Sequence, residues 1–187
     1  MRENLGIVGR SGEHLLALIN DVLEMSKIEA AQADLKEGNF DLHELLDGLE
    51  EMFYLRARDK DLDLAFQRDE DLPQYVHADQ NRLRQVLINL IGNAIKFTAS
   101  GQVQLLVEHK SDASSSHLSF AVEDTGPGIA ADKLNTIFES FGQAPSDQQE
   151  HEGTGLGLSI SQHFVHLMGA QISVQSQWGQ APPFLLQ

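Results

Sequence analysis

Apolar residues recur at helical spacing along the first part of the chain. Residues 5–32 are expected to form one helix, because their apolar positions follow spacings of three and four. These positions are Leu15, Leu16, Ile19, Val22 and Leu23. The stripe is narrow and suits a two-helix seam, with packing against its own domain as the alternative. A polar break follows, so we expect a hinge that separates segment 1–34 from a compact domain over 35–187.

Two capped helices are predicted in the compact domain. Asp41 is placed to cap a helix over 42–53, and Glu44 three residues later resembles a capping box. Asp79 is placed in the same way before a helix over 80–97.

Alternating apolar and polar residues indicate strands between and after these helices. The segments are 62–66, 75–76, 102–108, 117–123 and 171–176. A turn rich in Ser and Asp joins the third and fourth as a hairpin, and a helix over 159–168 precedes the fifth. The tail contains Pro182-Pro183, and proline cannot donate to a central ladder. We therefore expect this end to be truncated, frayed or at a sheet edge.

Composition limits the possible functions. The chain has 187 residues, and 41% of them are apolar, which is ordinary for a globular core. Its 13 Lys and Arg against 28 Asp and Glu give a net charge of −15, without a basic cluster, so nucleic-acid binding and direct membrane contact are not expected. The sequence has no cysteine and no apolar run of about 20 residues, so we expect no disulfide, no membrane span and a cytoplasmic location.

Four polar residues follow one side of the helix predicted at 80–97. Gln85, Asn89, Asn93 and Lys96 recur at spacings of four, four and three, on a helix that is otherwise largely apolar. Carboxamides contribute little to a core, but their oxygens can complete a magnesium shell, and a lysine one turn on can meet phosphates. The alternative is that this line is only the wet face of the helix.

An aspartate enters a glycine turn where the strand over 117–123 ends. Asp124 is followed by Gly126 and Gly128. A carboxylate only accepts hydrogen bonds, so it can take one from an exocyclic amine, and glycines let a ring lie against bare backbone. The alternative is a plain turn from aspartate to glycine.

A glycine-rich segment opens the helix predicted at 159–168. The sequence Gly-Thr-Gly-Leu-Gly-Leu at 153–158 follows residues 142–152, which show no periodicity and are interpreted as a flap. Free N–H groups at a helix N-terminus attract anions, and glycines allow phosphate oxygens to approach. The alternative is a simple hinge.

Taken together and in this order, the segments resemble the ATP-binding catalytic domain of sensor histidine kinases. These belong to the superfamily of gyrase, heat-shock chaperone, histidine kinase and MutL mismatch-repair ATPases. The N box of the family is similar to residues 89–98, the first glycine box to 124–129, the F box to 138–141 and the second glycine box to 153–158. The resemblance implies an α/β fold of the Bergerat type, which is a two-layer sandwich with a mixed sheet backed by helices, here preceded by one long helix.

The same resemblance implies roles for individual residues. Asn89 and Asn93 would hold Mg²⁺, Asn89 and Lys96 would be the catalytic residues at the phosphates, and Asp124 would bind the adenine amine. The other nucleotide contacts would come from Gly126 and Gly128 at the base and from Thr154, Gly155, Leu156 and Gly157 at the phosphates, under a lid over 139–154.

A reaction is implied as well. Relatives that hydrolyse ATP place a glutamate where this chain has Asn89, and an amide is no base, so the γ-phosphoryl group would pass to a histidine. The family's His-Glu-Leu-Arg-Thr-Pro-like segment does not occur in the sequence, and residues 5–32 resemble only the second dimerisation helix. We therefore expect a histidine kinase fragment of a two-component phosphorelay that binds Mg-ATP without phosphorylating itself. Its expected partners are the phosphoacceptor helix of a homodimeric parent protein and a response-regulator receiver domain.

Two alternatives and two departures from the family pattern stay open. ATP could gate contacts of the first helix without phosphoryl transfer, or the chain could be a dimerisation scaffold that has lost nucleotide binding. Ser140 stands where many relatives have a basic residue or proline, and Ala170 replaces an expected glycine.

Four histidines are expected to pack, face solvent or lie on mobile surface rather than accept phosphate or bind a metal. They are His14, His151, His163 and His166.

Overall fold

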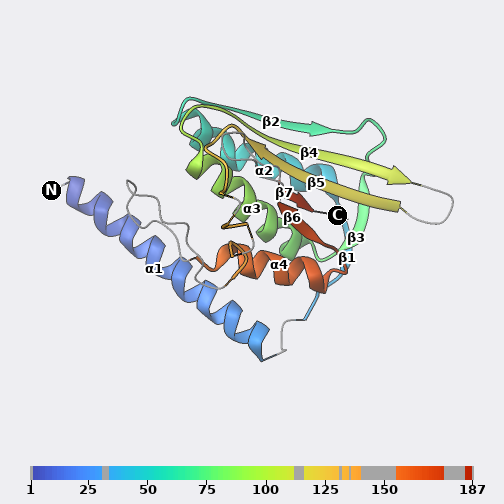
Figure 1. Cartoon of the computed structure of the whole chain (residues 1–187), viewed down its shortest axis with the longest axis horizontal. Helices are drawn as coiled ribbons and strands as arrows, with labels where there is room; N and C mark the ends of the chain where they lie inside the picture. The colour runs from blue at the N-terminus through green and yellow to red at the C-terminus, as the bar shows by residue number, and fades with distance from the viewer. Residues whose placement is uncertain are drawn as a thin grey trace.

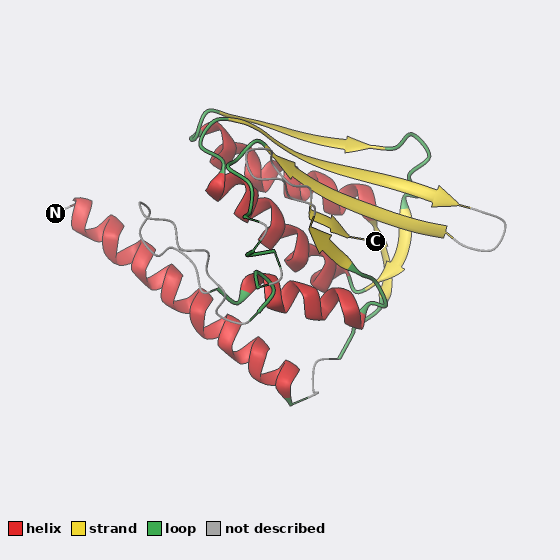
Figure 2. Cartoon of the chain, viewed as in Figure 1, coloured by secondary structure: helices red, strands yellow, loops and turns green. Residues whose placement is uncertain are grey.

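A mixed sheet backed by helices forms the body of the molecule, and one long helix runs along its side (Figure 1). This computed structural model describes residues 2–30, 34–111, 116–130, 132–134, 136–139, 155–174 and 184–186. The helices α2, α3 and α4 lie to one side of the strands, as the colouring by secondary structure makes clear (Figure 2). The predicted α/β two-layer sandwich is confirmed.

The main sheet has five strands within the described residues. In spatial order they are β2 (Leu62–Arg68), β4 (Gly101–Ser111), β5 (Ser116–Asp124), β7 (Phe184–Leu186) and β6 (Ile172–Val174). β2 runs parallel to β4, and every other neighbouring pair is antiparallel. A parallel pair needs a crossover connection, and the segment that contains α3 supplies it. The sheet and α3 are therefore tied together by the chain itself.

Both predicted caps are present. The helices of the body are α2 (Leu42–Arg58), α3 (Gln80–Phe97) and α4 (Gly157–Leu167). Asp41 Oδ1 accepts a hydrogen bond from the N–H of Glu44 at 3.0 Å, which caps α2. Asp79 Oδ1 accepts from the N–H groups of Asn81 and Arg82, each at 3.0 Å, which caps α3. Local sequence thus sets where these two helices begin.

The core lies between the sheet and the helices. Val103, Leu105 and Val107 alternate along β4 and are buried, as the period of a strand requires. Leu87 and Leu90 of α3 are fully buried on the helix side. Burial of one such side chain contributes roughly 1.5–3 kcal/mol, so this packing holds α3 firmly and leaves its polar side for the site.

A second sheet has two strands, one directly before α2 in sequence and one directly before α3. β1 (Gly38–Asp41) pairs antiparallel with β3 (Tyr75–Ala78). The second of these strands was expected from Tyr75-Val76, but β1 was not, because Phe40 is its only apolar residue and gives no alternation. Because the pairing is antiparallel, Asp41 at the end of β1 lies opposite Tyr75, and Gly38 lies opposite Ala78; α2 follows β1 and α3 follows β3 in the chain.

The C-terminal tail contradicts its prediction. β7 lies inside the sheet between β5 and β6, so the expectation of a truncated, frayed or edge segment was wrong. Residues Phe184–Leu186 pair with Phe120–Val122 on one side and with Ile172–Val174 on the other. Pro182 and Pro183 precede the strand in sequence, so all three ladder residues keep their N–H groups.

The long helix α1 (Arg2–Glu29) begins and ends three residues earlier than predicted. Its apolar stripe is exposed, for example at Leu16 (62%) and Leu23 (54%). α1 contacts α4, and Glu24 Oε2 lies 2.9 Å from Arg82 Nη1 of α3. No helix in the described part of the chain is long and apolar enough to cross a membrane. The division at residue 34 stays a prediction.

Candidate nucleotide-binding site

The two asparagines of α3 form a hydrogen-bonded line that reaches α4. Asn89 Nδ2 donates to Ser161 Oγ at 2.9 Å, and Asn93 Nδ2 donates to Asn89 Oδ1 at 3.4 Å. Ser161 is buried, with 2% of its surface exposed. The polar side of α3 is therefore not merely a wet helix face, because part of it is bonded to a neighbouring helix.

The second glycine box meets the N box at Gly157. A Cβ placed on Gly157 would collide with the Oδ1 of Asn89 and lie 3.0 Å from its Cγ. Only glycine permits this approach, so the first residue of α4 packs directly on the carboxamide of α3. Asn89 and Gly157, 68 positions apart in sequence, are thus in direct contact.

The N-terminus of α4 has no side-chain cap. Leu156 holds the N-cap position, and its side chain is fully buried in the core. Any contact of Leu156 with a ligand would therefore come from its backbone. The predicted contact Thr154, the F-box residue Ser140, His151 and most of the predicted lid lie outside the described residues.

Asp124 lies at the end of β5 and binds back to α3. Its Oδ1 accepts a hydrogen bond from the N–H of Gly126 at 2.8 Å and one from Thr98 Oγ1 at 3.3 Å. A Cβ on Gly126 would come within 2.7 Å of Asp124 Oδ1 and 3.3 Å of the carbonyl of Phe97. The first glycine box is thus packed against the C-terminal end of α3.

Thr98 was missed by the sequence reasoning. It is the C-cap residue of α3, and none of its surface is exposed. Its hydroxyl fixes one oxygen of Asp124, which makes it a part of the site. The available signal was its position as the last residue of the N-box segment, directly before the chain turns into β4.

The carboxyl of Asp124 is electrostatically unusual. Burial raises its pKa above the ordinary value, against the opposing effect of the hydrogen bonds from Gly126 and Thr98. Asp124 is kept partly out of water, and no ion pair to it is found among the described residues, so it gains from a bound hydrogen-bond donor. The environment therefore favours a ligand that donates to this carboxylate.

Two more residues of the predicted polar line have other neighbours. Lys96 Nζ lies 4.9 Å from the centre of the Phe97 ring, at the last turn of α3. Gln85 Oε1 accepts a hydrogen bond from Arg82 Nη1 at 3.1 Å. Lys96 is thus on the same end of α3 as Thr98, whereas Gln85 is bonded to Arg82, which pairs with Glu24 of α1.

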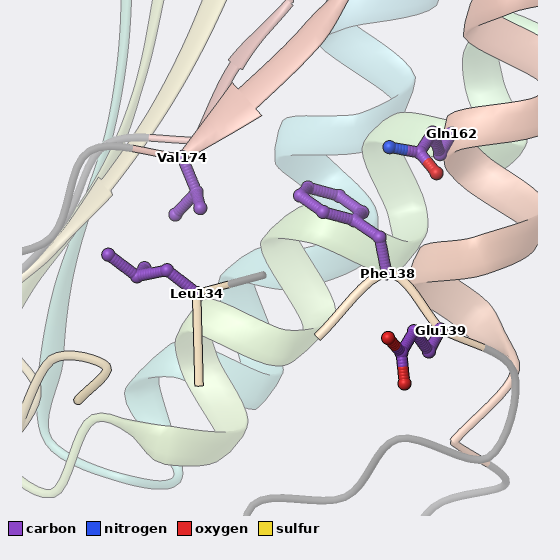
Figure 3. A pocket seen from close by; sticks show the side chains of 5 residues that line it. All are labelled: Leu134, Phe138, Glu139, Gln162 and Val174. Atoms are coloured by element: carbon purple, nitrogen blue, oxygen red, sulfur yellow. The ribbon is translucent and has the colours of Figure 1, made fainter. Parts of the chain in front are cut away.

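A cavity of about 530 Å³ opens at a different place. Its described lining comes from α4, β6 and the segment 134–139 (Figure 3). The residues are Leu134, Phe138, Glu139, Gln162 and Val174. None of them is a predicted nucleotide contact, and the lining offers no cluster of charged donors. We therefore place the candidate site along α3, at Asn89 and Asn93 beside α4 and at Asp124 beside Thr98.

Two of the histidines considered in the sequence lie on α4. His163 and His166 are one turn apart on α4, and burial, together with the neighbouring His166, lowers the pKa of His163. Within the described residues no group of three His, Cys, Asp or Glu side chains could hold a metal ion. His14 lies in α1, but its side chain is outside the described part of the chain.

Comparison with known proteins connects this geometry to a family. Residues 78–182 match the family model described as histidine kinase-, DNA gyrase B- and HSP90-like ATPase. The chain is 40% identical to hybrid signal transduction histidine kinase B of Dictyostelium discoideum over 185 residues, which is 98% of this chain and 9% of that protein. It thus spans about a tenth of this curated relative.

Solved structures of histidine kinases have the same fold. The crystal structure of full-length ShkA in complex with AMPPNP superimposes with a TM-score of 0.83 at 37% identity, covering 99% of this chain and 38% of that one. The histidine kinase ThkA in complex with the response regulator TrrA gives a TM-score of 0.71 at 25% identity, covering 98% and 49%. The family match includes the N box, both glycine boxes and the carboxylate of Asp124. The chain therefore belongs to the histidine kinase-, DNA gyrase B- and HSP90-like ATPase family and contains the ATP-binding domain that defines it.

Proposed function

We propose that this chain binds Mg-ATP and transfers the γ-phosphoryl group to a histidine on a dimerisation helix that the chain does not contain. One observation carries the proposal. Two segments that are distant in sequence contact α3, which carries the N box: the first glycine box through the hydrogen bond from Thr98 to Asp124, and the start of α4 through the close approach of Gly157 to Asn89. Both glycine boxes therefore adjoin the same helix, which supports a single ligand site along it.

Asp124 is the proposed reader of the base. Its Oδ1 is already engaged by Gly126 and Thr98, so Oδ2 is the oxygen available to the exocyclic amine of adenine. The phosphates would lie toward the uncapped N-terminus of α4, whose N–H groups favour anions. Lys96, Thr154 and Gly155 are proposed to complete the phosphate contacts.

The carboxamides of α3 suit a magnesium ion in their chemistry. Asn93 turns its N–H toward Asn89, which directs its own oxygen away from that neighbour. Amide oxygens are ligands that Mg²⁺ accepts beside phosphate oxygens and water. Asn93 and Asn89 would hold the ion, which when bound neutralises phosphate charge.

Asn89 supports transfer to a protein group rather than hydrolysis. Its Nδ2 donates to Ser161, and a carboxamide has no basic site that could deprotonate water. Transfer of the γ-phosphoryl group would then require a nucleophile that is itself reactive at neutral pH, such as an imidazole. The contribution of this chain is to bind, orient and shield the triphosphate.

The remaining parts of the proposal concern the parent protein. We propose a homodimeric sensor kinase whose phosphohistidine is passed to a response-regulator receiver domain. The names of the matched proteins support this, since one is a hybrid signal transduction kinase and another was solved with a response regulator. A cytoplasmic position, with or without a membrane anchor elsewhere in the parent, is part of the same proposal.

The test is a phosphotransfer assay with wild type and one variant. The chain is mixed with radiolabelled Mg-ATP and a separately made pair of dimerisation helices that carries an acceptor histidine, and acid-labile label on that partner is counted. Wild type is expected to label the helices, and Asp124→Asn to label them far less. A chain that binds ATP but leaves a well-folded partner unlabelled would contradict the kinase assignment.

A second function, a nucleotide-gated interaction module, is favoured by one contact. Arg82 of α3 pairs with Glu24 of α1 at 2.9 Å, and its guanidinium lies 4.1 Å from the centre of the Phe164 ring of α4. A shift of α4 on nucleotide binding would therefore reach α1 directly. Cross-linking of α1 to α4 that changes with ATP, without any phosphoryl transfer, would favour this module.

A further inference from the structure

A lysine outside every family box holds the end of α3. Lys60 lies in the turn between α2 and β2. Its Nζ donates to three backbone carbonyls, those of Ile95 at 2.7 Å, Lys96 at 2.8 Å and Thr98 at 3.2 Å. The ammonium group has three N–H donors, and all three are directed at the C-terminus of one helix.

This arrangement has a clear electrostatic reason. The last carbonyls of an α-helix lack partners within the helix and carry its partial negative charge. At the C-cap the backbone N–H of Thr98 donates to the carbonyl of Ala94, one of the last carbonyls of α3. The charge of Lys60 therefore both satisfies the terminal carbonyls and draws them to one point.

One of the residues held by Lys60 also orients Asp124. Thr98 offers its carbonyl to Lys60 and its hydroxyl to Asp124, so one residue joins the lysine to the carboxylate. Gly126, which donates to the same carboxylate, is packed against the carbonyl of Phe97 and the hydroxyl of Thr98. Movement of the helix end would displace both donors that fix Oδ1 of Asp124.

We propose that Lys60 is a positioning residue for base recognition. By fixing the C-terminus of α3 it holds Thr98 and Gly126 so that Oδ2 of Asp124 faces the exocyclic amine of the base. Lys60 therefore sharpens the preference for adenine without touching the nucleotide. This inference rests on the proposed function, because it assigns a role within the same site.

The test compares two nucleotides on the full 187-residue chain. ATP and purine riboside triphosphate, which lacks the exocyclic amine, compete with a fluorescent ATP analogue for wild type, Lys60→Met and Lys60→Arg. Lys110→Met is the matched control, because Lys110 has 76% of its side chain exposed and forms an ion pair with Glu108, away from α3. Thermal unfolding is recorded in parallel, and binding is measured well below each melting temperature.

Lys60→Met is expected to weaken ATP binding about tenfold while leaving purine riboside triphosphate near its wild-type value. The preference for ATP should therefore collapse, and Lys60→Arg, which keeps the charge and several donors, should recover most of it. Lys110→Met should keep the wild-type preference. If Lys60→Met does not fold, the same ratio is measured for Lys60→Gln, which keeps an N–H donor without the charge.

A merely structural lysine would give another pattern. The melting temperature of the variant would fall while its ratio of ATP to purine riboside triphosphate affinity stayed at the wild-type value, and that result would overturn the role of Lys60. A wild-type chain that does not bind ATP at all would instead overturn the proposed function, and this inference with it. The two failures are therefore separated by the wild-type measurement alone.

Discussion

Replacement of Asp124 by asparagine separates recognition from stability. The variant keeps the shape of the side chain and can keep one oxygen toward Gly126 and Thr98, which donate to Oδ1 at 2.8 and 3.3 Å. The second oxygen becomes an NH₂ group, which would point its donors at the amine of adenine. A hydrogen bond to a charged group contributes about 1.5–3 kcal/mol, so ATP should bind about 10- to 150-fold more weakly.

The same substitution is not expected to destabilise the fold. Burial raises the pKa of Asp124, which means that the folded chain bears an energetic cost for its charge at neutral pH. Asparagine removes that charge, so the melting temperature should stay equal or rise. Asp63→Asn, which changes the same charge at an exposed position of β2, serves as the control.

The assay is titration of a fluorescent ATP analogue followed by competition with ATP and with purine riboside triphosphate. Asp124→Asn should lose affinity for ATP but not for the analogue that lacks the amine. Equal ATP affinity in wild type and variant, with both well folded, would remove Asp124 from base recognition. A large fall in melting temperature would refute the electrostatic part of the reasoning.

Three further predictions follow from other contacts. Gly157→Ala should displace the Asn89 carboxamide and cost about 1–3 kcal/mol in urea unfolding together with weaker ATP binding, whereas Gly38→Ala, with nothing within 4 Å, should change neither. Asp79→Ala removes the cap of α3 and the 2.7 Å hydrogen bond that anchors the linker before β1, and should cost about 1–2 kcal/mol in the same measurement. The raised pKa of Asp124 means that its carboxylate is protonated at a higher pH than an ordinary aspartate, so ATP affinity should begin to fall at that higher pH on acidification. Folding stability should improve over the same fall in pH, because the folded chain binds the proton more tightly than the unfolded chain. The same loss of ATP affinity at low pH in Asp124→Asn would contradict this prediction.

The sequence carried the local features of this fold well. Asp41 and Asp79 were recognisable as caps because a cap is decided within four residues. The polar spacing of Asn89 and Asn93 on a largely apolar helix marked the site for the same reason, since both lie on one element. The expected convergence with Gly157 came from the family resemblance, not from the spacing.

Features that depend on contacts between distant segments could not be predicted from local sequence patterns. β7 was misjudged because two prolines dominate its neighbourhood, whereas the strand itself is only Phe184–Leu186 and is defined by its partners on either side. Thr98 and Lys60 are ordinary residues in sequence, and their roles arise from hydrogen bonds that span 26 and 38 positions. Pairings of this kind are specified by the assembled core rather than by any local pattern.

The place of β7 also affects how the domain is made on the ribosome. In the described part of the chain β6 is hydrogen-bonded only to β7, so it cannot join the sheet until residues 184–186 have been synthesised. Until then the edge of β5 stays open for pairing with another chain, which is a known route to aggregation. Completion of this sheet is thus delayed until residues 184–186 have left the exit tunnel, and nascent chains that stall before residue 184 should be unusually dependent on chaperones.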